Sequence, residues 1–116
     1  MPLIEIDALP QPPGIDPAKV TVAVNRAVAA ALGSRLDAVW TVWRTVSGPY
    51  ARGGDVQSEQ GRETHGPIVH VYHHRTPAEV ASLVAAIEET LTRELSIAPD
   101  NVFVTVQPVE FVERRD

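Results

Sequence analysis

Hydrophobic and polar positions divide the chain into two halves with the same predicted order of elements. In the first half, residues 3–9 alternate between apolar and acidic positions, which is the period of a half-buried strand. Asp16 and Pro17 then supply an N-cap and a first helical position, and apolar residues recur at helical spacing as far as Gly33. The β-rich run 39–46 follows. This half therefore predicts strand, helix, strand.

The second half repeats that order. A strand is predicted from Pro67 to Tyr72, and residues 76–79 (Thr-Pro-Ala-Glu) form a capping box with proline at the first helical position. An apolar stripe runs to Leu95, and residues 102–106 give the closing strand. The two halves thus begin with Pro2 and Pro67 and contain matching helix starts.

Two β-α-β units predict an α+β fold, because each crossover makes its two strands parallel and places its helix on one face. We expect a four-stranded mixed sheet with two helices on one side, within a single domain spanning 1–116. Its predicted parts are repeat unit one (2–46), a connecting segment (47–66), repeat unit two (67–110) and a C-terminal tail (111–116). The connecting segment holds five of the seven glycines and is expected to be a crossing between the halves or a hairpin, with its role left open.

One side of such a sheet carries no helix. It would expose Trp40 or Trp43, Phe103 and several valines, which is a large apolar area to leave in water. We therefore expect a symmetric oligomer that buries this face or the strand edges. The alternative is a monomeric sandwich with a few exposed aromatic residues.

Composition narrows the classes of partner. The 116 residues suit one domain, and the formal net charge of −5 argues against nucleic acid and anionic membranes while leaving room for a small anionic substrate. There is no cysteine, so thiol chemistry and disulfides are excluded. With no signal-peptide pattern and no apolar run long enough to span a membrane, we expect a cytoplasmic protein.

Pro2 is the first candidate for chemistry. Removal of Met1 would leave Pro2 with a free secondary amine, and an apolar pocket would lower the pKa of that amine and favour the neutral, proton-accepting form. In a polar setting the amine would stay protonated and act as an acid. The alternative is that Pro2 only starts a strand. If Met1 is retained, the Pro2 nitrogen is an amide and proline catalysis is impossible.

Three segments resemble the tautomerase superfamily, which includes 4-oxalocrotonate tautomerase (4-OT), macrophage migration inhibitory factor (MIF), malonate semialdehyde decarboxylase and the chloroacrylic acid dehalogenases. They are Met1-Pro2-Leu3-Ile4, Arg75-Thr76-Pro77 and residues 97–104 (Ile-Ala-Pro-Asp-Asn-Val-Phe-Val). The length is similar to that of the two-unit members. The resemblance implies a homotrimer with a cofactor-independent site at each N-terminal proline.

The resemblance also implies that Arg75, at the strand-to-helix junction, binds a substrate carboxylate. A guanidinium beside a helix N-terminus suits that role physically. The decarboxylase and dehalogenase branches have a second arginine before it, where this chain has His74 or His73. We interpret His70 and His74 as parts of a polar pocket wall rather than as metal ligands, and no metal site is expected.

Four further residues are candidates. Asp37 resembles the catalytic aspartate of malonate semialdehyde decarboxylase, although we favour its interpretation as a turn residue after Gly33 and Ser34. Trp40 and Phe103 stand where 4-OT has an arginine and would give an apolar wall. Arg44 could supply a second cation if it faces the pocket.

These residues support three hypotheses about function. The first is a keto–enol tautomerase acting on a small 2-oxo or 2-hydroxydienoate acid, in which Pro2 moves the proton and Arg75 holds the carboxylate. The second is a decarboxylase or a hydratase or dehalogenase, with protonated Pro2 and Asp37 as its partner. The third is a non-catalytic trimeric module, which follows if Met1 is retained.

Overall fold

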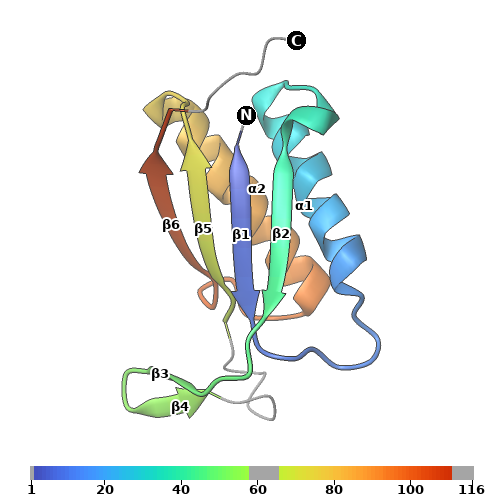
Figure 1. Cartoon of the computed structure of the whole chain (residues 1–116), viewed down its shortest axis with the longest axis vertical. Coiled ribbons are helices and arrows are strands. Elements are labelled where there is room, and N and C mark those ends of the chain that lie inside the picture. Colours follow the sequence, from blue (N-terminus) through green and yellow to red (C-terminus); the bar gives the residue numbers. More distant parts are fainter. Residues whose placement is uncertain (1, 58–65, 111–116) are drawn as a thin grey trace.

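The computed structural model describes residues 2–57 and 66–110, which form a sheet covered on one face by two helices, with a small hairpin at one end (Figure 1). The elements in chain order are β1 (Leu3–Ala8), α1 (Pro17–Leu32), the 3₁₀ turn η1 (Leu36–Ala38), β2 (Trp40–Thr45), β3 (Tyr50–Arg52), β4 (Asp55–Gln57), β5 (Ile68–His73), α2 (Pro77–Leu95) and β6 (Phe103–Pro108).

The main sheet has the strand order β2-β1-β5-β6. Each outer pair, β1 with β2 and β5 with β6, is parallel and is joined through its own helix, whereas the central pair β1 and β5 is antiparallel. The predicted α+β fold of tandem β-α-β units is therefore confirmed. Because the central pair is antiparallel, each end of the sheet carries the start of one unit and the strand-to-helix junction of the other.

The helix starts that the sequence predicted are present. The Asp16 side chain accepts a hydrogen bond from the Ala18 amide (3.0 Å) at the start of α1, and Gly33 ends that helix with a φ of 63°. At α2 the Thr76 hydroxyl accepts from the Glu79 amide while the Glu79 carboxylate accepts from the Thr76 amide. These caps satisfy backbone donors that a helix cannot satisfy internally.

The core lies between the sheet and the helices. Its fully buried large side chains come from β1, β5, α1, α2 and the residue after β1: Ile4, Ile6, Leu9, Val24, Val28, Val69, Leu83, Ile87, Leu91 and Leu95. Burial of each such side chain contributes roughly 1.5–3 kcal/mol to stability. This packing holds both helices against the sheet and fixes the ends where the candidate residues lie.

The opposite face of the sheet is open and is more polar than its sequence suggested. Trp40 and Phe103 are 58% and 63% exposed, whereas Trp43 packs against the core. The centre of this face carries the ion-paired side chains of Asp7 and Arg44. The exposed apolar residues therefore lie on the outer strands β2 and β6.

The connecting segment contains a hairpin, in which β3 pairs antiparallel with β4 beyond the end of the main sheet (Figure 1). Two side chains anchor the hairpin. The Tyr50 hydroxyl donates to the carbonyl of Gly66, the last residue of the connecting segment (2.6 Å), and Arg52 Nη1 donates to Asn101 Oδ1 of the second unit (2.7 Å). Within the described residues, no helix is both long and apolar enough to cross a membrane.

Candidate active site

Pro2 lies at the end of the sheet where β1 and β2 begin and β5 ends. Leu3 is paired with Trp40 on one side and with Tyr72 on the other, and the Trp40 amide donates to the Pro2 carbonyl (3.1 Å). Pro2 is buried. Because β5 runs directly into α2 at this end, the register brings Pro2, Trp40 and the junction that carries Arg75 to one edge of the sheet.

Arg75 is positioned by the start of α2 and is 22% exposed at its side chain. Its Nη1 atom pairs with Glu79 Oε2 (3.1 Å), and its backbone amide donates to His73 Nδ1 (3.1 Å). The Nε atom is buried and has no hydrogen-bond partner among the described residues. A buried guanidinium donor without a partner is costly unless a ligand or water satisfies it, and a carboxylate is its preferred acceptor.

The Glu79 carboxylate balances part of the charge of Arg75. Hydrogen bonds from the Thr76 amide and hydroxyl lower the pKa of Glu79, and the neighbouring Arg75 acts in the same direction. Glu79 is therefore ionised near neutral pH and holds one side of the guanidinium, while the Nε edge remains unpaired within the described part of the chain.

The structure separates the two histidines that the sequence could not distinguish. His73 is 5% exposed and directly follows Tyr72, the partner of Leu3 across the β1–β5 pair. Its Nδ1 accepts a hydrogen bond from the Arg75 amide, and its carbonyl accepts one from the Val109 amide (2.7 Å). His74 is exposed and also has an interaction partner. His73 is a buried contact of Arg75 that sequence reasoning did not single out, although strand alternation places it on the buried face with Val69 and Val71.

Asp37 also lies at the Pro2 end. It sits on η1, three residues before Trp40, and is largely exposed with a side-chain exposure of 69%. Its carboxylate pairs with Arg35 Nη2 (2.7 Å). The structure thus brings Asp37 to the same edge as Pro2 but gives its charge a local partner.

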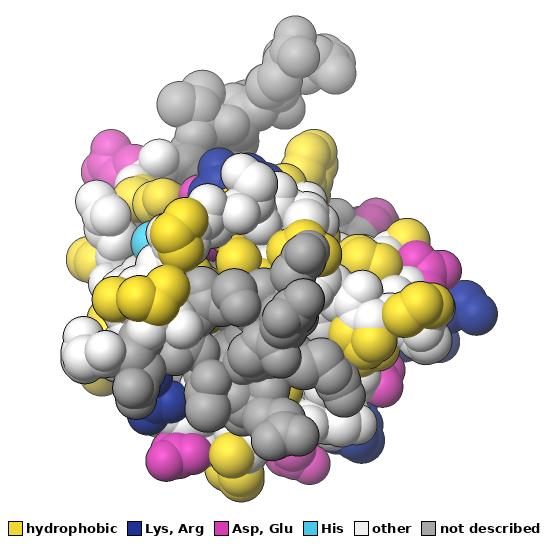
Figure 2. Space-filling model, turned by 90° about the horizontal axis from the view of Figure 1, so that it is seen from below, with side chains coloured by type: hydrophobic (Ala, Val, Ile, Leu, Met, Phe, Trp, Pro, Cys, Tyr) yellow, Lys and Arg dark blue, Asp and Glu magenta, His cyan; other side chains and the backbone are white. Residues whose placement is uncertain are grey.

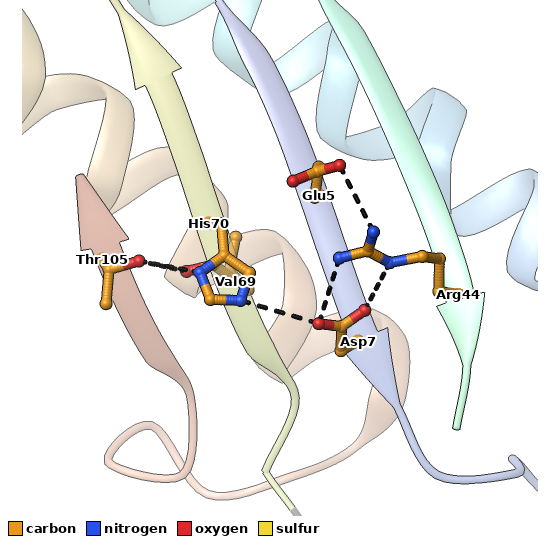
Figure 3. Close-up of polar contacts among 6 residues, drawn as sticks. All are labelled: Glu5, Asp7, Arg44, Val69, His70 and Thr105. Atoms are coloured by element: carbon orange, nitrogen blue, oxygen red, sulfur yellow. Dashed lines mark hydrogen bonds and ion pairs between the residues drawn. The ribbon is translucent and has the colours of Figure 1, made fainter. Parts of the chain in front are cut away.

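Arg44 and His70 lie on the open face, away from this edge (Figure 3). Arg44 makes two hydrogen bonds to Asp7 (2.7 and 3.2 Å) and reaches Glu5 at 3.5 Å, and its contact with Asp7 raises the pKa of Arg44. His70 lies between Asp7 (3.6 Å) and Thr105 (3.1 Å). Asp7 is five residues along β1 from Pro2, or about 17 Å at strand rise. The structure therefore does not bring Arg44 or His70 to Pro2 within one chain.

Within residues 2–57 and 66–110, no group of three His, Asp or Glu side chains is arranged so that it could hold a metal ion.

Phe103 occupies the opposite end of the sheet. It pairs with Ile68 at the start of β5, and its amide donates to the Pro67 carbonyl (3.1 Å). This bond is the counterpart of the bond from Trp40 to Pro2. Trp40 therefore lies beside Pro2, whereas Phe103 lies beside Pro67.

The fold is shared with solved structures. Pt0534 inactivated by 2-oxo-3-pentynoate superposes with a TM-score of 0.77 at 20% identity, covering 92% of this chain and 85% of that one. An asymmetric trimer of wild-type F6 fused 4-OT gives 0.75 at 19% identity, with 92% and 85% coverage. A macrophage migration inhibitory factor-like protein from Entamoeba histolytica gives 0.71 at 12% identity, with 93% and 88% coverage.

No family model matches the sequence, and no curated protein matches it. The likeness to fused 4-OT and MIF structures therefore rests on the arrangement of the whole chain. It confirms that the two-unit architecture predicted from the sequence is shared with fused 4-OT structures.

Proposed function

We propose that this chain is a member of the tautomerase superfamily and acts as a keto–enol tautomerase on small 2-oxo or 2-hydroxydienoate acids, with Pro2 as the general acid–base group. The observation that carries the proposal is the antiparallel pairing of β1 and β5, which puts Pro2 and Arg75 at one edge of the sheet. The inactivation of Pt0534, which shares this fold, by the unsaturated 2-oxo acid 2-oxo-3-pentynoate supports this substrate class.

In the proposed reaction, Arg75 binds the substrate carboxylate through the guanidinium edge that Glu79 leaves unoccupied. The neutral Pro2 amine removes the proton from the 2-hydroxyl of the enol and returns a proton to carbon, so that the 2-oxo acid forms. Burial of Pro2 favours the neutral amine, which is the form that accepts a proton. Trp40 provides the apolar wall, and His74 stands at the rim.

We propose that the active protein is a homotrimer. Exposed apolar side chains lie on both outer strands, with Trp40 and Val42 on β2 and Val106 on β6. Burial between copies would remove this apolar surface from water. The trimeric state of the F6 fused 4-OT supports the same assembly here.

The proposal is tested by ketonisation of phenylenolpyruvate after intact-mass measurement has established loss of Met1. We expect Pro2→Ala to lower kcat/KM by about 10²–10⁴-fold, the range for loss of a general acid–base group. The Arg26→Ala variant, which changes an exposed arginine on α1, is the matched control and should keep full activity. Unchanged turnover in Pro2→Ala would end the proposal.

A lyase or hydratase activity is the second candidate, because Asp37 lies at the same edge as Pro2. It would require protonated Pro2 and the Asp37 carboxylate. A rate that depends on protonated Pro2 and is lost in Asp37→Asn would favour this reaction over tautomerisation. If mass measurement instead shows Met1 retained, Pro2 carries no basic nitrogen and a non-catalytic trimeric module becomes the better description.

A further inference from the structure

A cavity of about 380 Å³ lies at the end of the sheet opposite Pro2, beside the hairpin. Its lining comes from β3, the start of β5 and the residues that lead into β6, and includes Tyr50, Arg52, Ile68, Asn101, Val102 and Phe103. A cavity of this size is in the lower part of the range for small-molecule sites, about 300–1,000 Å³. Figure 2 looks at the molecule from this end and shows hydrophobic side chains on the face, with charged side chains toward its margin.

Arg52 supplies the cation of this cavity. Its Nη1 atom donates to Asn101 Oδ1 (2.7 Å), a neutral acceptor that belongs to a residue only 5% exposed. No ion pair joins Arg52 to a side chain that the structure describes. The guanidinium is therefore anchored in place while its charge is left for an anion, and carboxylates are the anions whose geometry it matches.

The remaining lining is suited to the body of a ligand. Phe103 is 63% exposed and stands with Ile68 and Val102 as an apolar wall. The Tyr50 ring is held by the hydrogen bond from its hydroxyl to Gly66. Gly66 itself approaches the chain so closely that a Cβ there would lie against the Asn101 carbonyl oxygen, so the backbone of this end is tightly set.

The two ends of the sheet repeat one plan with one difference. At each end an aromatic residue donates its amide to a proline carbonyl at 3.1 Å, Trp40 to Pro2 and Phe103 to Pro67. Each end also carries an arginine, but from a different element: Arg75 lies between β5 and α2, and Arg52 ends β3. The Pro67 nitrogen, however, is bonded to Gly66 within the chain and can neither take up nor release a proton. This end could therefore bind a carboxylic acid through an arginine, but it has no amine that could transfer a proton to or from the acid.

We propose that the Pro67 end is a second ligand site, which binds small planar carboxylates through Arg52 without turning them over. Asp100 is the acidic residue among the described lining and opposes an anion. The site is independent of Pro2, of Met1 removal and of the proposed activity.

The test is titration of the protein with benzoate, followed by the backbone amide signals of Gly66, Asn101 and Phe103 in proton–nitrogen correlation spectra. The Arg75→Ala background removes the carboxylate-binding group at the other end. In that background we expect the three signals to shift in a saturable way. Adding Arg52→Ala should weaken the binding at least tenfold, Asp100→Asn should strengthen it at least twofold, and Arg26→Ala should leave it unchanged.

Three results would overturn the proposal: no shifts at these amides, equal shifts with benzyl alcohol, which has no carboxylate, or benzoate binding that Arg52→Ala leaves intact. The spectra also report whether each variant is folded. If Arg52→Ala disturbs the hairpin, Asp100→Asn decides alone, because unchanged or weaker benzoate binding in that variant contradicts a site governed by charge.

Discussion

The Arg75 side chain is held in place by Glu79 and still has a hydrogen-bond donor without a partner among the described residues. The Arg75 Nη1 atom donates a hydrogen bond to Glu79, and the Arg75 backbone amide donates one to His73. The Arg75 Nε atom is buried without a partner among the described residues. An isolated surface arginine would lose side-chain entropy on binding a ligand, whereas Arg75 has already lost much of it. Preorganisation of this kind is what a carboxylate-binding residue requires.

We therefore expect Arg75→Ala to raise KM for a 2-oxo acid substrate by roughly 10–150-fold, the equivalent of the ~1.5–3 kcal/mol of a hydrogen bond to a charged group. Arg75→Lys should recover only part of this loss, because an ammonium cannot offer two parallel donors. Steady-state kinetics of both variants would measure the effect. Arg93→Ala, an exposed arginine near the end of α2, is the control, and an equal KM in Arg75→Ala and wild type would contradict the assignment.

The sequence predicted the positions of some candidate residues better than those of others. Pro2, Trp40 and Arg75 belong to strand starts and a strand-to-helix junction, so their placement at one edge follows from topology. Arg44 was different, because strand alternation gives the face of the sheet but not the ion partner, and its bond to Asp7 spans 37 residues of sequence. Pairing across strands depends on register, which a single sequence does not reveal.

At the scale of elements, the helix caps were the most predictable features because each depends on residues within one turn. The Thr76–Glu79 box was visible as a four-residue pattern and is formed. The turn η1 and the pairing of β3 with β4 were less predictable. The hairpin is held by contacts distant in sequence, the bonds from Tyr50 to Gly66 and from Arg52 to Asn101.

The capping box gives a prediction about stability. Thr76→Ala should lower the free energy of unfolding by about 1 kcal/mol at neutral pH, the usual cost of losing an N-cap side chain. Urea unfolding at a fixed protein concentration measures it. Ser82→Ala, an exposed site within α2, is the control and should change stability much less.

The same box makes part of the stability depend on pH. Hydrogen bonds from Thr76 lower the pKa of Glu79 in the folded chain. The ionised carboxylate therefore stabilises the fold at pH values above 4.5, the ordinary pKa of a glutamate. That contribution is lost as the pH falls through the lowered pKa. Urea unfolding should therefore show Glu79→Gln to be less stable than wild type at pH 7 and to approach wild type in acid.

At the scale of the whole molecule, the open face and the outer strands are the surfaces through which the proposed trimer would form. The sequence indicated an apolar face, but the structure places an ion-paired cluster of Glu5, Asp7 and Arg44 at its centre. Within the main sheet, the large apolar residues that stay exposed belong to β2 and β6. Burial of these outer strands would leave the charged centre in contact with water.

Val42, which is 42% exposed on β2, tests this arrangement. We expect Val42→Glu to convert a trimer of about 38 kDa, three times the 12.6 kDa chain, into monomers, because a carboxylate buried in an interface carries a large desolvation cost. Light scattering coupled to gel filtration would show it. Val22→Glu, on the exposed side of α1 at 46% exposure, should remain trimeric, and a Val42→Glu trimer would contradict the role of this strand.

The antiparallel pairing of β1 and β5 also determines where circular permutation could place a new N-terminus. Pro2 and Val109 flank the end of β5, since β1 lies on one side of it and the Val109 amide bonds to His73 from the other. A permuted gene that linked these two points and opened at Pro67 would retain the same core. It would also exchange the chemistry of the two ends, with a free secondary amine beside Phe103 and Arg52 and an inert amide beside Arg75.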